Sequence, residues 1–336
     1  MRRKSLRLTT MAAVAALSLA LAGCSDDSVT GESPTDEPSG DADTGTSEST
    51  ELTPVTVGLL QIAPAAAVQL GVDNGIFEEQ GLDVSVQLGQ GGAALLPAVS
   101  SGSIQFAVGN PLSVLVAASQ GLEMEIIAGY SRINDPAPSG IVVKADSGIT
   151  TWKDLEGKTV ALNAINTQGD LGTMEWVERD GGDPGNVTFT EIAFPDQLAQ
   201  LEQGYIDASW IPEPFLSASL GTEGVEWLGD PLTAIEELYT MVTFSSNDYT
   251  EANPEITDAF VAGITEATAY AMENEEEYRA AIVDYTGMPA EVVENIRLEV
   301  LTGELDAGVI EELSALALKH GMLDSEPDLS AVIRAQ

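Results

Sequence analysis

Residues 54–88 read PVTVGLLQIAPAAAVQLGVDNGIFEEQGLDVSVQL. The apolar run Pro54–Leu60 predicts a buried strand. Ala63–Asn74 has small and apolar residues at helical spacing and is followed by Gly75, a residue that typically ends a helix. Leu82–Leu88 then alternates apolar and polar residues, which predicts a second strand. Strand, helix and strand in this order indicate an α/β fold with mainly parallel strands.

The same alternation continues along the chain. It predicts strands at Ile104–Val108, Met124–Tyr130, Ser139–Lys144, Thr159–Leu162, Val187–Ile192, Ile206–Trp210 and Tyr239–Phe244, and helices at Ala93–Ser101, Pro111–Gln120, Leu171–Arg179, Gln197–Gln203 and Pro214–Leu220. Everything after Asn253 is predicted to be helical, over Ile256–Met272, Tyr278–Tyr285, Ala290–Val300 and Val309–Leu318. We assign the strand Ser139–Lys144 to a first compact lobe, and we expect a second lobe to begin after the turn at 146–148.

The N-terminus has the parts of a secretory signal. Basic residues at 2–7 precede a short apolar run, Met11–Leu21, and small residues lead to Cys24. The run is too short for a mature membrane span, which needs ~20 residues. Leu21-Ala-Gly-Cys24 resembles the lipobox of bacterial lipoproteins, which implies cleavage after residue 23 and lipid attachment to Cys24. A plain signal peptide with an incidental cysteine is the alternative.

Residues 24–52 are expected to form a disordered acidic tether. They carry nine acidic side chains, no basic one and no aromatic one, so they cannot bury enough apolar area to fold. Removal of the four basic residues before Cys24 would leave 9 basic against 54 acidic side chains, a net charge of −45. Nucleic acid is excluded as a partner, because phosphate binding needs a basic surface.

The inventory of reactive side chains argues against an enzyme. His320 is the only histidine and Cys24 the only cysteine, so no Ser/His/Asp triad, Cys/His dyad or histidine-rich metal site can be assembled. The sequence Lys319-His320-Gly321 is typical of a helix C-terminus, where a surface or dipole-capping role is expected of the histidine. We therefore expect no catalytic residues, no metal and no cofactor.

Four segments, in order, resemble one protein group. They are Asn74–Val84 (NGIFEEQGLDV), Leu95–Val108 (LLPAVSSGSIQFAV), Asp154–Ala161 (DLEGKTVA) and Leu198–Phe215 (LAQLEQGYIDASWIPEPF). Together they are similar to the nitrate/sulfonate/taurine and thiamine-pyrimidine group of ABC-transporter substrate-binding proteins. The resemblance implies the type 2 periplasmic binding-protein fold, in which two α/β lobes are joined by two crossovers. Residues 53–146 and 236–336 would form lobe one, and residues 147–235 would form lobe two.

Ligands of open α/β sheets bind beyond the carboxyl ends of the strands, so the residues that follow each strand are the candidates. We predict substrate-binding roles for Gln61, Gln90, Gly91, Asn110, Arg132, Asn166, Thr167, Gln168, Trp210 and Glu213. Gly89-Gln-Gly-Gly92 is expected to present backbone N–H groups, with a purely structural turn as the alternative. Arg132 is the only basic candidate and suits an oxyanion, although it could equally pair with Asp135. Arg132 is expected to face Trp210 and Glu213 across the cleft.

The resemblance implies a solute-binding protein, anchored outside the cell membrane by lipid, that captures a small polar or oxyanionic molecule by lobe closure and delivers it to an ABC permease and its ATPase. A monomer is expected. Nitrate-, sulfonate- and taurine-like ligands come first, and a thiamine pyrimidine precursor or an aromatic acid is the alternative. A ligand-sensing surface lipoprotein and an enzyme on the same scaffold are the rivals from other classes.

Overall fold

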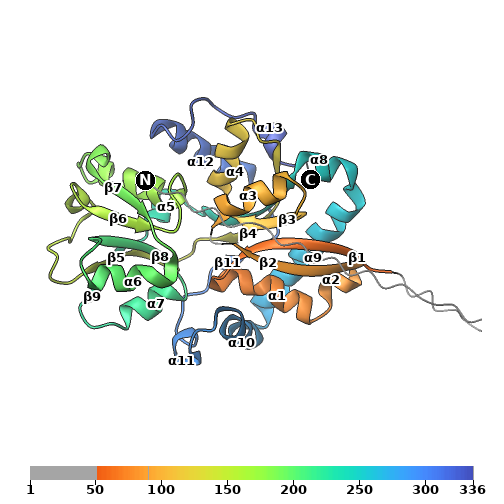
Figure 1. Cartoon of the computed structure of the whole chain (residues 1–336), viewed down its shortest axis with the longest axis horizontal. Coiled ribbons are helices and arrows are strands. Elements are labelled where there is room, and N and C mark those ends of the chain that lie inside the picture. Colours follow the sequence, from red (N-terminus) through yellow and green to blue (C-terminus); the bar gives the residue numbers. More distant parts are fainter. Residues whose placement is uncertain (1–50, 90, 336) are drawn as a thin grey trace, which may run out of the picture. The chain divides into compact units, whose positions relative to one another are not determined.

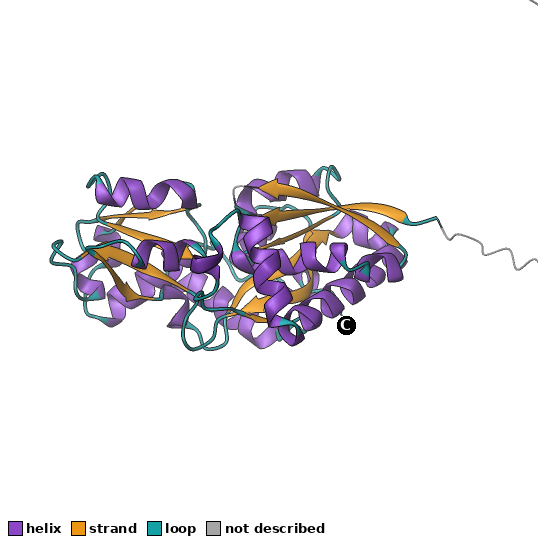
Figure 2. Ribbon diagram, turned by 90° about the horizontal axis from the view of Figure 1, so that it is seen from below, coloured by secondary structure: helices purple, strands orange, loops and turns teal. Residues whose placement is uncertain are grey.

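A computed structural model describes residues 51–89 and 91–335, which form two mixed sheets with helices packed around them (Figure 1). The predicted signal segment, most of the tether and Cys24 lie outside the described residues. Figure 2 shows that helices cover the strands of each sheet on both sides. Among the described residues, no helix combines the length and apolarity needed to cross a bilayer.

The first sheet has six strands in the order β11-β4-β10-β3-β1-β2. Their bounds are β1 Thr53–Leu60, β2 Leu82–Gly89, β3 Phe106–Gly109, β4 Met124–Arg132, β10 Tyr239–Ser246 and β11 Val300–Leu301. Strand β1 pairs in parallel with β2 and β3, whereas β10 is inserted antiparallel between β3 and β4. All eight residues of β10 are buried, which explains their apolar and small hydroxyl character.

Helices α3 and α4 lie on one side of the first sheet in Figure 1, and α1 and α2 lie on the other. The helices associated with this sheet, directly or through one another, are η1 Ala63–Ala65, α1 Ala66–Asp73, α2 Ile76–Glu79, α3 Gly92–Ser100, α4 Pro111–Ser119, α8 Asn247–Ala252, α9 Pro254–Glu273, α10 Glu275–Thr286, α11 Ala290–Val293, α12 Ala307–Lys319 and α13 Leu329–Val332. As predicted, Gly75 follows the end of the helix that α1 forms, and it has a left-handed φ of 74°.

Small residues bring α1 and α9 into close contact. A Cβ atom on Gly71 would lie 2.6 Å from the Cβ of Ala267, and one on Gly263 would lie 2.6 Å from the ring of Phe77. The ring of Phe260, on α9, stacks on Phe77 at 5.6 Å between centroids. Helix α9 thereby approaches α1 at Gly71 and α2 at Phe77 closely, as the dense packing of protein interiors requires.

The second sheet has five strands in the order β7-β6-β8-β5-β9. Their bounds are β5 Ser139–Lys144, β6 Thr159–Leu162, β7 Thr188–Glu191, β8 Ala208–Pro212 and β9 Val225–Gly229, and the helices around them are η2 Trp152–Leu155, α5 Gln168–Arg179, η3 Pro184–Asn186, α6 Phe194–Glu202, α7 Phe215–Leu220 and η4 Pro231–Ala234. Strand β6 is parallel to β7 and β8, and β5 is antiparallel to β8 and β9.

The chain passes between the two sheets twice. Residues 133–138 connect β4 to β5, and residues 230–238 connect β9 to β10. The return of β10 and β11 to the first sheet agrees with the topology that the resemblance implied. We call these two segments the crossovers.

Two sequence-based expectations need correction, and one strand was missed. The strand Ser139–Lys144 belongs to the second sheet, because it pairs with β8 and β9; its apolar pattern could not reveal which partners it would have. Ala290–Val300 is not one helix: α11 ends at Val293, and Val300 begins strand β11 against β4. The edge strand β9 was not predicted. None of its five residues is fully buried, and they form no apolar run.

Candidate functional site

A cavity lies where the carboxyl ends of strands from both sheets meet, as the rule for open α/β sheets predicts. It encloses about 580 Å³ of space not filled by atoms, part of which is open to solvent. Its lining residues are Leu60, Ile62, Gly109, Asn110, Ser139, Asn163, Ala164, Thr167, Phe194, Trp210, Pro212, Leu232, Thr240, Met241 and Glu299.

Two amide side chains join the sheets at the cavity. The Nδ2 atom of Asn110, directly after β3, donates to Oε1 of Gln168 at 2.5 Å, and Nε2 of Gln168 donates to the carbonyl of Tyr239 at 2.7 Å. The Oδ1 atom of Asn110 also accepts from the backbone of Leu112 at 3.0 Å and so caps α4. Both predicted residues are brought together, and Gln168 acts by holding Asn110 rather than by lining the cavity.

The N-terminus of α5 supplies the lining residue Thr167. Thr167 is the N-cap of α5 and forms a capping box with Asp170, whose carboxylate accepts from the Thr167 backbone at 2.7 Å. Burial raises the pKa of Asp170 to about 6, against the lowering effect of these hydrogen bonds. Asn166 has a left-handed φ of 57° and is exposed. Thr167 is thus placed at the cavity, whereas Asn166 supplies the turn that leads to it.

Trp210, in the middle of β8, forms one wall. It is buried, and its ring packs edge-on against Phe194 with 5.9 Å between centroids. Among the residues that the structure describes, the buried indole Nε1 has no hydrogen-bond partner, which is unusual because a buried polar group normally has one. The wall is therefore apolar, with one N–H donor that is not satisfied within the protein.

Glu299 is the only acidic side chain among the lining residues, which include no Lys, Arg or His. It is buried and accepts a hydrogen bond from Oγ1 of Thr240, whose hydroxyl also contacts Oγ of Ser131 at 2.5 Å. Burial raises the pKa of Glu299 to about 7, and the nearby Asp230 adds to the rise. A carboxyl group is therefore the one acidic or basic group among the described lining residues.

Arg132 does not meet the expectation that it faces Trp210 and Glu213. Its guanidinium pairs with Glu237 at 3.4 Å and lies over the ring of Tyr239, 5.8 Å from the centroid. It lines a separate hollow together with Asp135. Arg132 ends β4, and the side chains of a strand alternate between the two sides of the sheet, so its place at a strand end did not decide where its side chain would lie.

The carboxylate of Glu213 is held by hydrogen bonds within the protein. Its carboxylate accepts from the backbone and hydroxyl of Ser217 at 2.9 and 2.8 Å, and from the backbone of Arg297 at 3.2 Å. Burial raises the pKa of Glu213, although these hydrogen bonds lower it. Glu213 thus holds the first turn of α7 and the segment before β11, and it is not among the residues that line the cavity.

The remaining candidates lie at the margin of the cavity or outside it. Gln61 is exposed and donates to the carbonyl of Tyr285 at 3.1 Å. Gly91 is buried beside the second sheet, and a Cβ atom there would lie 3.0 Å from Nδ2 of Asn163. Gln90 lies outside the described residues. The glycine at 91 therefore permits the close approach of its loop to a lining residue.

Several lining residues were missed as candidates. Ser139, Leu232, Thr240, Met241 and Glu299 come from the crossovers, from the starts of β5 and β10, and from the segment before β11. None of them follows a strand at its carboxyl end. The one signal available was the single acidic residue in Leu298-Glu-Val-Leu301, an isolated charge in an apolar run.

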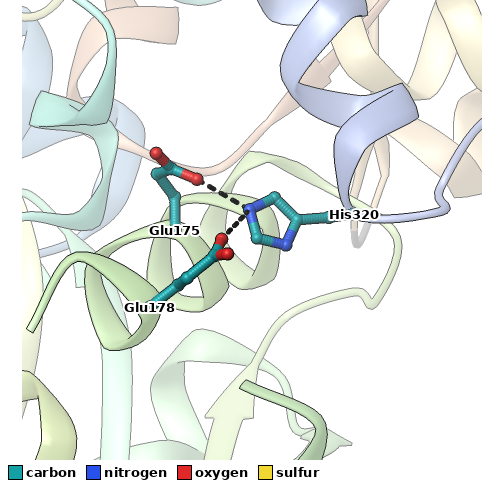
Figure 3. A group of neighbouring side chains, drawn as sticks. All are labelled: Glu175, Glu178 and His320. Atoms are coloured by element: carbon teal, nitrogen blue, oxygen red, sulfur yellow. Dashed lines mark hydrogen bonds and ion pairs between the residues drawn. The ribbon is translucent and has the colours of Figure 1, made fainter. Parts of the chain in front are cut away.

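The lone histidine lies in an ion-pair cluster between α5 and the end of α12 (Figure 3). Nε2 of His320 is 2.7 Å from Glu175 and 3.7 Å from Glu178, and Nζ of Lys319 is 2.5 Å and 2.8 Å from the same carboxylates. The predicted helix C-terminus is confirmed, but the side chain is only 5% exposed rather than at the surface. Three of these groups could reach one metal ion, but Lys319 already neutralises the carboxylates.

The profile of the family described as NMT1/THI5 like matches residues 65–278. The chain belongs to this family. Among curated relatives, the chain is 27% identical over 210 residues to the taurine-binding periplasmic protein of Escherichia coli K12, an alignment that covers 61% of this chain and 62% of that protein. It is 24% identical to the formylaminopyrimidine-binding protein of Halalkalibacterium halodurans, over 62% of each. The chain thus spans less than two thirds of these NMT1/THI5-like relatives.

Solved structures share the fold of this NMT1/THI5-like chain. The alkanesulfonate-binding protein SsuA from Xanthomonas axonopodis pv. citri, bound to MOPS, superposes with a TM-score of 0.74 at 17% identity, covering 84% of this chain and 99% of that one. The nitrate-binding protein NrtA from Synechocystis PCC 6803 gives a TM-score of 0.73 at 15% identity, over 84% and 86%. The periplasmic binding-protein fold implied by the sequence is confirmed.

Proposed function

We propose that this protein is the extracytoplasmic solute-binding component of an ABC importer. The observation that carries the proposal is a cavity lined by residues of both sheets, at the crossovers that join them. Membership of a family whose relatives include taurine- and sulfonate-binding proteins supports the same role. The partners would be a permease and its ATPase, and the protein would act as a monomer.

The mechanism that fits this arrangement is hinge closure. Only the two crossovers connect the sheets covalently, and the Asn110–Gln168 hydrogen bond joins them at the cavity. A ligand bound between the lobes would favour the closed form by contacting both. A form of the protein that begins near Glu51 should therefore show a smaller radius of gyration in X-ray scattering when ligand is saturating. An unchanged profile with a tight ligand would contradict closure.

The ligand is proposed to be a small polar or oxyanionic organic molecule, with taurine and alkyl sulfonates as the first candidates and a pyrimidine precursor as the alternative. Uptake of labelled compounds by cells with and without the gene tests transport directly. Loss of uptake of one compound on deletion, restored by the gene, is the expected result. Normal uptake of every compound in the deletion strain would count against an importer component.

We infer a lipid anchor from Leu21-Ala-Gly-Cys24. A buried acyl chain contributes about 0.8 kcal/mol per methylene, so two or more chains hold a protein on a bilayer. Replacement of Cys24 by Ala should abolish acyl labelling and release the protein or leave it uncleaved. Membrane retention without any label on the unaltered protein would exclude the anchor.

We propose no catalytic activity. His320, the only histidine of the sequence, is held in the cluster with Glu175 and does not line the cavity. The cavity offers a carboxyl, hydroxyls and amides, which can orient a ligand but do not form a nucleophile and base pair of the usual kind.

A further inference from the structure

The polarity of the cavity is the starting point. An oxyanion is normally held by arginine or lysine, whose donors match its oxygens. The basic candidate, Arg132, pairs with Glu237 outside the cavity, and the described lining residues include Glu299 and no basic side chain. The same lining has an apolar wall formed by Leu60, Phe194 and Trp210. Such a site disfavours a ligand whose only polar group is an anion.

Glu299 has an incomplete set of partners for a buried carboxylate. Buried charges are normally paired or hydrogen-bonded several times. Among the described residues, Glu299 forms no ion pair, and its donors are the hydroxyls of Thr240 and Ser131. The two hydroxyls also contact each other, with 2.5 Å between their oxygens. The pair of hydroxyls therefore orients the carboxyl group without neutralising it.

The groups around Glu299 are acidic or neutral. Asp230 is close enough to raise the pKa of Glu299. The charge of Glu299 in turn helps to raise the pKa of the Tyr130 and Tyr278 phenols. Arg297, two residues earlier, acts on Asp230 and donates from Nη1 to the carbonyl of Ala137. No group in this set supplies a positive charge directly to Glu299 in the described part of the chain. A cationic or N–H donor group of a ligand would supply it.

Trp210 contributes the apolar face of this wall. Its indole Nε1 is buried and has no hydrogen-bond partner among the described residues, so the ring, rather than the N–H, borders the cavity. The cavity thus fits a molecule with an N–H donor on an otherwise apolar or aromatic frame.

We propose that Glu299 is the ligand-recognition residue of the cavity and that the ligand presents to it an N–H donor, as an amine or an amino-substituted ring does. The inference rests on the proposed solute-binding function and narrows its ligand candidates: taurine and the pyrimidine precursor, which carry a nitrogen donor, are retained, and nitrate and alkyl sulfonates without such a donor are excluded. A sulfonate can be part of the ligand only if the same molecule carries the nitrogen donor.

A pH dependence follows. With a pKa near 7 in the ligand-free protein, Glu299 is mostly ionised at pH 8 and mostly protonated at pH 6. A ligand N–H needs the ionised form, so its affinity should fall roughly tenfold between pH 8 and pH 6. Glu299→Gln removes the titration and should leave the residual affinity nearly constant over this range.

The test uses isothermal titration calorimetry with matched probes. Taurine is compared with ethanesulfonate, and 4-aminopyrimidine with pyrimidine, because the members of each pair differ only in the nitrogen donor; nitrate is the simple oxyanion. We expect binding of one or both amino members and not of their partners. Glu299→Gln should weaken that binding roughly ten- to a hundredfold, the value of a charge-assisted hydrogen bond. Glu304→Gln, an exposed carboxyl outside the cavity, is the matched control and should bind normally.

The outcomes separate the two proposals. Binding of nitrate, ethanesulfonate or pyrimidine as tightly as of the amino members would overturn the ligand class while supporting the solute-binding function. Binding of an amino member that is unaffected by Glu299→Gln would overturn the role of Glu299. Absence of binding by every probe would count against both proposals. The comparison of probes on the unaltered protein needs no variant, so it stands even if Glu299→Gln fails to fold.

Discussion

Glu175→Gln should measure how strongly the ion-pair cluster holds α5 to the end of α12. The Glu175 side chain is 6% exposed and lies 2.5 Å from Nζ of Lys319, 2.7 Å from Nε2 of His320 and 2.8 Å from Nε of Arg179. Burial raises the pKa of the Glu175 carboxyl, but the hydrogen bonds from Lys319, His320 and Arg179 outweigh it and lower the pKa from an ordinary 4.5 to about 2.

The magnitude follows from that pKa. A carboxyl whose pKa is about 2 in the folded state contributes about 3 kcal/mol to the free energy of unfolding at neutral pH. Since the folded pKa is depressed, this contribution is complete above pH 4.5 and is lost as the pH falls toward 2. Lys319 and Arg179 are 45% and 43% exposed, so screening reduces the expected loss in Glu175→Gln to about 2 kcal/mol.

Urea denaturation followed by circular dichroism tests this. At pH 7 the midpoint for Glu175→Gln should fall, and the difference from the unaltered protein should shrink as the pH is lowered to 3. Glu178→Gln is the matched control: it lies on the same helix and contacts Lys319 and His320 but is 48% exposed, so it should cost under about 1 kcal/mol. Equal losses in both variants, or a loss that does not depend on pH, would refute the reasoning.

Three further predictions concern stability and the contact between the sheets. Gly129→Ala should cost about 1–3 kcal/mol in thermal denaturation, because its Cβ would lie 2.0 Å from the carbonyl oxygen of Glu304; a melting temperature equal to that of the unaltered protein would contradict the packing. In the ligand-free protein, the free energy of unfolding should fall as the pH rises from 5 to 8, because burial raises the pKa of Asp170 to about 6 and of Glu299 to about 7, so that folding favours their protonated forms; a flat profile would argue against it. Gln168→Ala should expand the ligand-free protein in X-ray scattering, since it removes the bond from Asn110; an unchanged radius of gyration would show that this bond does not hold the sheets together.

The sequence predicted the local elements well and their partners poorly. Strands β1 and β2 and the helix between them follow from the apolar pattern and from Gly75, because those signals are local. Strand β5 was equally clear as a strand, but its pairing with β8 depends on residues about seventy positions away. The return of the chain after residue 236 to the first lobe came from the resemblance, and the insertion of β10 between β3 and β4 was not predicted, since no periodicity encodes it.

The residues of the candidate site were likewise predicted only in part. Asn110 and Thr167 were found because they follow β3 and β6, and the carboxyl ends of parallel strands converge. Trp210 was found because its strand was expected to end there, although β8 continues to Pro212. Arg132 met the same criterion but points to Glu237, because the side-chain direction at a strand end depends on local twist and on available partners. Glu299 was missed because it was assigned to a helix, whereas the structure places it one residue before an edge strand.

The position of Glu299 links ligand recognition to the crossovers. On one side, the carbonyl of Leu298 accepts from Nδ2 of Asn134 at 2.9 Å, and Nη1 of Arg297 donates to the carbonyl of Ala137 at 3.0 Å. Both partners belong to the first crossover. A ligand that binds the Glu299 carboxylate therefore acts on a segment that is hydrogen-bonded to a connection between the sheets. A ligand shifts an equilibrium only through contacts that differ between states. A ligand bound to Glu299 can therefore favour closure through a single hydrogen bond. A ligand in this cavity does not contact Arg132, which lines a separate hollow.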